Sequence, residues 1–131
     1  MASINIFEAN LSDFEQVFEN FKTINSEIKL LLFLADKDPS TKLSWCPDCN
    51  VAEPVIDDML AATASDISIL KTFVGDRATW KNPIHPWRVD PRFKLRGVPT
   101  LIRWENGAIT ERLEDDEAHI GDKIHALLTG N

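Results

Sequence analysis

The stretch Trp45-Cys46-Pro47-Asp48-Cys49 decides the interpretation of this sequence, because it holds both cysteines of the 131-residue chain. It lies between an almost wholly apolar run that ends at Ala35 and a helical pattern that begins at about Cys46. We therefore expect the pair at a strand–loop–helix junction. The two-residue spacing serves two chemistries. One is dithiol–disulfide exchange, in which one thiolate attacks a substrate disulfide and the second thiol resolves the mixed disulfide; the other is metal binding.

The position of each cysteine predicts its role in disulfide exchange. At a helix start, Cys46 lies beside free backbone N–H groups and the positive end of the helix dipole, which both favour a thiolate. An interaction of about 1–2 kcal/mol lowers a thiol pKa by roughly 0.7–1.5 units, so we assign Cys46 as the nucleophile. Cys49, one turn into the helix, keeps a higher pKa and is assigned as the resolving thiol.

The two residues between the cysteines are expected to set the redox potential together. Pro47 presets φ for the first helical turn. The charge of Asp48 suits a helix N-terminus, yet a carboxylate near Cys46 opposes thiolate formation, so the sign of its effect stays open.

Metal binding and merely incidental cysteines remain as alternatives. A structural zinc site needs four ligands, and the chain has no second cysteine pair. The only histidines are His85, His119 and His125, and the last two do not share a helical face. We therefore expect no metal, and the surrounding strand–helix–strand pattern favours a redox pair over incidental cysteines.

Composition excludes several classes of protein. Apolar residues make up 44% and charged residues 27% of the chain, the profile of a globular domain that buries a core. The formal net charge of −7 argues against nucleic-acid and anionic-membrane partners. The longest apolar run, Leu30 to Ala35, is far too short for a membrane span, and the N-terminus lacks the pattern of a signal peptide. Two cysteines are also too few for a disulfide-stapled secreted scaffold.

Periodicity outside the motif predicts an α/β fold: one domain over residues 1–131, with a central mixed β-sheet flanked by helices on both faces. The expected strands are Ile4–Phe7, Lys29–Ala35, Ile67–Val74, Thr100–Glu105 and Ala108–Leu113. Three main helices are expected. The first begins at Ser12, the second runs from about Cys46 to Ala64 with Pro54 inside it, and the last contains Ile120 to Leu128 and stops near Gly130. The first half implies parallel strands joined by helical crossovers, and Asn106-Gly107 predicts an antiparallel hairpin.

Four local details follow from the same patterns. Ser12 and Glu15 have the spacing of a capping box, ahead of an apolar stripe of phenylalanines. A short helix is expected around Pro91–Lys94, and the acidic run Glu114–Glu117 is expected at a helix start, where the dipole favours it. The expected inner face of the second helix consists of Val51, Val55, Met59 and Leu60.

Several motifs together resemble the thioredoxin fold over nearly the whole chain. They are the 45–49 stretch, Pro54 in the following helix, Val98-Pro99-Thr100 before a strand, and the Asn106-Gly107 hairpin. The extended loop from Asp36 to Ser44 and the segment from Gly75 to Lys81 are more similar still to a family of small cytosolic thioredoxin-related proteins.

The resemblance implies a cytoplasmic protein-disulfide reductase that binds no cofactor and is recharged by thioredoxin reductase, with NADPH as the electron donor. Its implied substrates are disulfide-containing proteins or small disulfides, with peroxide reduction as a further activity, and we expect a monomer. Cys46 and Cys49 take the catalytic roles, and Pro47 and Asp48 tune the potential. Pro99 is implied to be a cis-proline, and Val98 offers its backbone to a bound substrate strand. From its position beside Cys46, Trp45 is expected to shield the site or to contact substrate, or else to serve only in packing.

Departures from ordinary thioredoxin predict a narrower substrate range. Leu32 occupies the position of the buried aspartate that aids proton transfer, and Leu113-Glu114 lies near the position of a substrate-facing glycine. The loop before Trp45 is also longer.

Residues 76–96 form a basic island in this acidic chain, with six basic residues against two acidic ones. If the island borders the cysteines, it favours a thiolate or steers acidic substrates; otherwise it is a solvated loop. Its tryptophan-rich part, residues 80–87, suggests an alternative function, a redox-sensitive interaction protein whose dithiol controls partner binding. A glutaredoxin-like enzyme recharged by glutathione is a third reading, and we expect that recharging to fail.

Overall fold

The computed structural model describes residues 3–130, which form one five-stranded sheet with helices on both sides. The strands are β1 (Ile4–Ala9), β2 (Ile28–Leu34), β3 (Ile67–Phe73), β4 (Thr100–Glu105) and β5 (Ala108–Leu113), in the spatial order β1-β3-β2-β4-β5. Strands β1 and β2 run parallel to β3, and β4 runs antiparallel to both β2 and β5. The α/β fold predicted from the sequence is confirmed.

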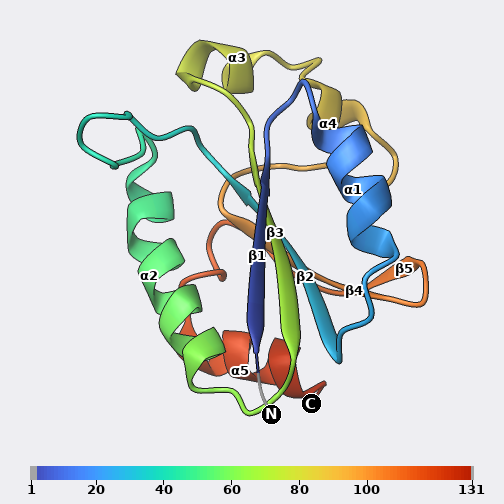
Figure 1. Ribbon diagram of the computed structural model, residues 1–131. Coiled ribbons are helices and arrows are strands. Elements are labelled where there is room, and N and C mark those ends of the chain that lie inside the picture. The colour runs from blue at the N-terminus through green and yellow to red at the C-terminus, as the bar shows by residue number, and fades with distance from the viewer. Residues whose placement is uncertain (1–2, 131) are drawn as a thin grey trace.

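Five helices surround the sheet: α1 (Phe14–Lys22), α2 (Pro47–Ala61), α3 (Arg77–Lys81), α4 (Pro86–Val89) and α5 (Gly121–Thr129). Helices α2 and α5 cover one face and α1 the other, with α4 beside α1 and α3 beyond the end of β3 (Figure 1). Central strands β2 and β3 are almost fully buried, which explains why their sequences are continuously apolar rather than alternating.

Aromatic side chains build the core between α1 and the sheet. Phe14 stacks on Phe18 with ring centroids 5.2 Å apart, and it meets the edges of Trp87 and Phe93 at 5.0 and 5.7 Å. Phe33 of β2 joins the same cluster. The apolar stripe predicted for the first helix is therefore core, and the cluster attaches the 76–96 segment to the body of the domain.

The start of α1 differs from the predicted capping box. The Asn10 side-chain oxygen accepts hydrogen bonds from the N–H groups of Ser12 and Asp13, so the chain forms a turn before the helix begins at Phe14. Glu15 pairs with Arg92 instead of reaching back to Ser12. Asn10, two residues upstream, takes the Ser12 N–H that the Glu15 carboxylate would have accepted in a capping box.

The short helix expected at Pro91–Lys94 is also wrong, because those residues form a turn in which Lys94 has a positive φ of 45°. Helices α3 and α4 occur earlier in the segment. The carboxylate of Asp76 caps α3 by accepting the Thr79 N–H at 2.8 Å, and Pro86 occupies the first position of α4. Both signals are present in the sequence.

Helix α2 buries a different face from the one expected. Cys49, Ala52, Ile56 and Leu60 face the sheet, whereas Val51 is 56% exposed. Val55 and Met59 are half-buried at the margin. The predicted inner face was wrong because it was chosen from the large apolar residues of the helix. The residues that pack closest to the sheet include the small side chains of Cys49 and Ala52.

The last part of the chain confirms the hairpin and corrects the acidic run. Asn106 and Gly107 have φ angles of 51° and 80°, as a two-residue hairpin turn requires. Glu114–Glu117 lies in the turns that precede α5, which begins only at Gly121, so the helix dipole does not explain the run. Within residues 3–130, no helix is long and apolar enough to cross a membrane.

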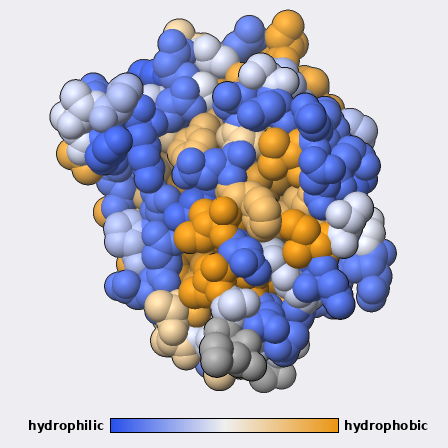
Figure 2. Space-filling view, viewed as in Figure 1, coloured by the Kyte–Doolittle hydropathy of each residue, from blue (hydrophilic) through white to orange (hydrophobic). Residues whose placement is uncertain are grey.

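Strand β1 forms one edge of the sheet and leaves apolar side chains on the surface. Figure 2 shows apolar side chains gathered on the face where Figure 1 places β1. In β1, Ile4 and Ile6 are 39% and 55% exposed.

Candidate functional site

Cys46 occupies the N-cap position of α2, at the end of the loop that follows β2. Its backbone is extended, with φ −99° and ψ 107°, and its sulfur accepts the N–H of Cys49 at 3.1 Å. Both cysteines are free thiols, and Cys46 is 6% exposed. Ser44 accepts the Cys46 N–H at 3.0 Å, and Asn50 bonds both the N–H and the carbonyl of Ser44, so the loop is tied to the first turn of the helix.

The two thiols have opposite pKa shifts. A hydrogen bond from the Cys49 thiol, with help from the Cys49 N–H, outweighs burial and lowers the pKa of Cys46 to about 7. The same hydrogen bond, together with burial, raises the pKa of Cys49. At neutral pH about half of Cys46 is thereby a thiolate while Cys49 stays protonated.

Asp48 affects the Cys46 pKa in two directions, which answers the question left open by the sequence. Its carboxylate charge raises the pKa of Cys46, and its backbone N–H lowers that pKa by facing the sulfur. The side chain therefore opposes the thiolate, and the backbone supports it. Pro47 stands at the first helical position, as predicted.

The segment before β4 forms the wall opposite the sulfur. The Val98–Pro99 peptide bond is cis, and the Cys46 thiol lies 3.6 Å from the Val98 carbonyl oxygen. Thr100 donates from its hydroxyl to the Gly97 carbonyl at 2.8 Å, which fixes the bend. The structure therefore brings Val98 and Pro99, which lie about fifty residues further along the chain, next to the cysteines. Their role in binding substrate stays a prediction.

Trp45 is half-buried and fixed by the loops after β3. Its indole N–H donates to the Gly75 carbonyl at 3.0 Å. The Arg77 guanidinium donates to the Trp45 carbonyl at 3.0 Å and lies 5.1 Å from the centre of the ring. Trp45 thus packs against the protein, and its contact with substrate remains a prediction.

Three of the six basic residues of the island, Arg77, Arg88 and Arg92, make contacts within the protein, and Lys81, Lys94 and Arg96 are exposed. Arg88 lies 3.7 Å from the centre of the Trp80 ring and donates to the Trp80 carbonyl, and Arg92 pairs with Asp90 and Glu15. Among residues 3–130, Arg77 is the member of the island that contacts the cysteine motif.

Comparison with known proteins places this geometry in a family. Residues 9–130 match the model for the thioredoxin domain of thioredoxin domain-containing protein 17-like proteins. The chain belongs to this family. It is 53% identical over 131 aligned residues to thioredoxin-like protein Clot of Oryza sativa subsp. japonica, covering 97% of this chain and 92% of the rice protein. It is 32% identical over 97 residues to thioredoxin domain-containing protein 17 of Homo sapiens, covering 74% of this chain and 76% of the human protein.

The fold agrees with the family. Thioredoxin of Schistosoma mansoni superposes with a TM-score of 0.58 at 16% identity, covering 96% of this chain and 94% of that one. The thioredoxin-like fold predicted from the motifs is confirmed.

This thioredoxin domain-containing protein 17-like chain has a partly buried ion cluster that the sequence analysis missed. Lys71 of β3 pairs in register with Leu32, and its ammonium contacts Glu53 at 2.8 Å and Asp57 at 3.0 Å. Lys37 binds the other oxygen of Glu53 at 2.7 Å. Burial acts against these charges, but the hydrogen bonds prevail, so the pKa of Glu53 is lowered and that of Lys71 is raised. Glu53 lies four residues, or one helical turn, after Cys49. That spacing was the sequence signal that could have placed Glu53 on the same side of the helix as Cys49.

The histidines of this family member lie away from the cysteines. His85 is buried; its Nε2 donates to the Val74 carbonyl at 2.8 Å and its Nδ1 accepts the Trp87 N–H, which assigns the tautomer. His119 and His125 are on the surface. Among the described residues, no three His, Cys, Asp or Glu side chains gather as a metal site.

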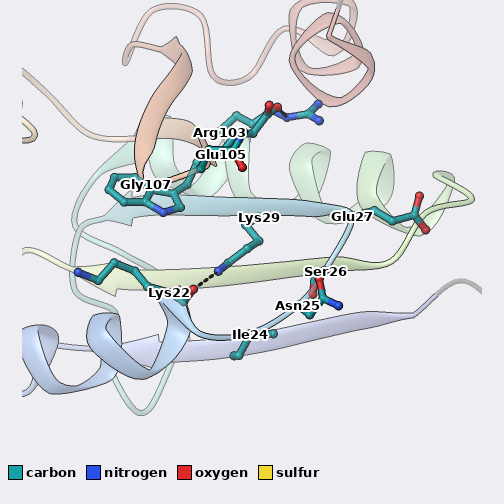
Figure 3. A pocket seen from close by; sticks show the side chains of 11 residues that line it. Lys22, Ile24, Asn25, Ser26, Glu27, Lys29, Arg103, Glu105 and Gly107 are labelled. Atoms are coloured by element: carbon teal, nitrogen blue, oxygen red, sulfur yellow. Dashed lines mark hydrogen bonds and ion pairs between the residues drawn. The ribbon is translucent and has the colours of Figure 1, made fainter.

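A polar hollow lies at the opposite end of β2 from the cysteines, between the end of α1 and the β4–β5 turn (Figure 3). Its cations are used internally. Lys29 donates to the Lys22 carbonyl at 2.8 Å, and Arg103 donates to the carbonyls of Leu127 and Leu128. The hollow therefore has little free positive charge to offer a ligand.

Proposed function

We propose that this chain is a thiol–disulfide oxidoreductase that reduces disulfides in the cytoplasm. The observation that carries the proposal is the Cys46 sulfur, whose pKa is lowered to about 7 by its hydrogen bonds with Cys49, facing the Val98 carbonyl at 3.6 Å. A partly ionised thiol beside a protonated second thiol is the arrangement that disulfide exchange requires.

The reaction has two exchange steps. The Cys46 thiolate attacks one sulfur of the substrate disulfide, forming a mixed disulfide and releasing the other substrate sulfur as a thiolate that takes up a proton. Cys49 then loses its proton and attacks the Cys46 sulfur, which releases the second substrate thiol. The substrate gains two electrons and two protons, and the protein is left with a Cys46–Cys49 disulfide.

Regeneration requires a dithiol or an enzyme that supplies two electrons. We assign this role to thioredoxin reductase, with NADPH as the ultimate donor, since the chain itself binds no cofactor in this scheme. We also propose that the protein is a monomer. Its substrate range is narrower than that of thioredoxin, because the 36–44 loop and the acidic β5–α5 loop border the site. Peroxide reduction is a further proposed activity of the same dithiol.

A redox-sensitive interaction protein is the second candidate function. It is favoured by exposed apolar side chains around α4, where Ile84 is 73% and Val89 58% exposed. In this alternative, formation of the Cys46–Cys49 disulfide changes the affinity for a protein partner, and turnover is slow.

A coupled assay separates the two functions. With NADPH, thioredoxin reductase and insulin or a small disulfide as substrate, the wild type should consume NADPH, and Cys46→Ser should not. Cys49→Ser should instead accumulate the mixed disulfide on Cys46, visible by mass spectrometry. Absence of turnover, combined with partner capture that depends on oxidation state, would support the interaction protein. Efficient recharging by glutathione alone would indicate a glutaredoxin-like enzyme.

A further inference from the structure

The C-terminal end of β5 lies at the same end of the sheet as the cysteines. Cys46 follows β2, the Val98–Pro99 segment precedes β4, and the chain leaves β5 at Leu113. Phe33 pairs with Thr100, and Leu101 pairs with Leu113. The loop after β5 therefore lies across the Val98 segment from Cys46, and the loop after β3, with Arg77, lies on the other side of Cys46.

Asp115 of this loop packs directly on the backbone next to Val98. A Cβ atom built on Gly97 would lie 2.6 Å from both the Cγ and an oxygen of Asp115, so only glycine permits this approach without movement. The Asp115 side chain is half-buried, and among residues 3–130 no ion pair or side-chain hydrogen bond is found for its carboxylate. A partly desolvated charge without a counter-ion gains from a cation brought by a ligand.

We propose that Asp115 is a specificity-determining residue for the disulfide exchange proposed above. It favours substrates that carry a lysine or arginine on the β5 side of the reacting disulfide and disfavours those that carry an acidic residue there. The preference is one-sided, because on the other side of Cys46 a substrate meets Trp45 with the Arg77 guanidinium over its ring. This inference rests on the proposed function and adds a substrate class to it.

The test measures the first exchange step alone. Cysteine peptides activated as mixed disulfides with thionitrobenzoate react with the reduced protein: the Cys46 thiolate bonds to the peptide sulfur, and thionitrobenzoate leaves as a coloured thiolate. One peptide series carries Lys, Ala or Glu two residues before its cysteine, and a second series carries them two residues after it. In one series only, we expect the wild type to react about tenfold faster with the Lys peptide than with the Glu peptide at low salt.

Variants connect this preference to one carboxylate. Asp115→Asn should bring the Lys-to-Glu rate ratio close to one, and Asp115→Lys should invert it. Asp116→Asn is the matched control: it removes the same charge from the exposed neighbour and should leave most of the ratio intact. Reaction with the Ala peptide within about twofold of the wild type shows that each variant is folded and that Cys46 is intact.

Other results overturn the inference. Equal effects of the Asp115 and Asp116 changes would show only a general acidic field, and equal ratios in both peptide series would exclude a one-sided contact. If the wild type and Cys46→Ser react alike with the Ala peptide, the proposed function itself fails, which is a distinct outcome.

Discussion

Replacement of Asp48 by Asn should lower the pKa of Cys46, since the carboxylate charge opposes the thiolate while the backbone N–H of residue 48 is retained. Asp48 is two positions after Cys46 in the first helical turn, and a charge pair this close in a largely solvated setting is worth roughly 1 kcal/mol. Asp48 is exposed. Solvent screening therefore reduces this to about 0.5–1 kcal/mol, or about half a pKa unit.

The consequence is largest below neutrality. With a pKa near 7, about a tenth of Cys46 is thiolate at pH 6, and a shift of half a unit raises that fraction to about a quarter. The rate of alkylation by iodoacetamide at pH 6 should therefore rise about twofold to threefold, and slightly less if the more acidic thiol is also less nucleophilic. The full pH profile of alkylation, and the thiolate absorbance in the ultraviolet, measure the same pKa independently.

A matched control keeps the reasoning specific. Asp58 is an exposed carboxylate farther along α2, so Asp58→Asn removes the same charge from the same helix at a greater distance. It should leave the Cys46 pKa nearly unchanged, and the effect of Asp48→Asn should shrink in high salt. A Cys46 pKa that stays constant or rises in Asp48→Asn would refute the assignment of opposing roles to the side chain and the backbone.

Three further predictions concern stability, each measured by urea unfolding. Burial lowers the pKa of His85 in the folded protein, so the unfolded state binds a proton on His85 first as pH falls. The free energy of unfolding should therefore keep its full value above about pH 6.5 and decline below it, and His85→Gln should remove that decline. A wild type equally stable at acid and neutral pH would contradict this. Lys71→Met should cost about 2–4 kcal/mol, and combining it with Glu53→Gln should cost less than the sum of the single changes; strict additivity would exclude a coupled ion cluster. Gly97→Ala should cost about 1–3 kcal/mol because its Cβ meets Asp115, and Asp115→Gly in the same chain should restore most of the loss; no restoration would place the strain elsewhere.

The parts of the fold that depend on local signals were predictable from the sequence. The Asn106-Gly107 hairpin has the predicted bounds, the run before the long loop is the buried strand β2, and Cys46 lies at the start of α2. In each case the signal and the structure lie within a few residues of each other. The predicted capping box is wrong because a nearby competitor, Asn10, accepts the Ser12 N–H that Glu15 was expected to accept.

The parts that depend on contacts between distant residues were not predictable. Trp45 is held by residues of the loop after β3, and Lys71 of β3 pairs with Glu53 of α2. Asp115 reaches Gly97 only because β4 and β5 are neighbours in the sheet. Charge counting over residues 76–96 suggested a basic site, whereas packing uses Arg88 and Arg92 to hold aromatic rings and carboxylates. Sequence composition reports which charges exist but not which are already paired.

The order of strands in the sheet has a consequence for protein synthesis. Strand β2 and helix α2 leave the ribosome with both cysteines well before the segment that carries Val98 is made. Strand β1 waits as well, with Ile4 unpaired until Ile67 of β3 is available. During this interval the dithiol lacks the Val98 segment that later faces it. The nascent chain therefore carries both thiols before the Val98 carbonyl can face Cys46, and only synthesis of the segment before β4 completes this arrangement.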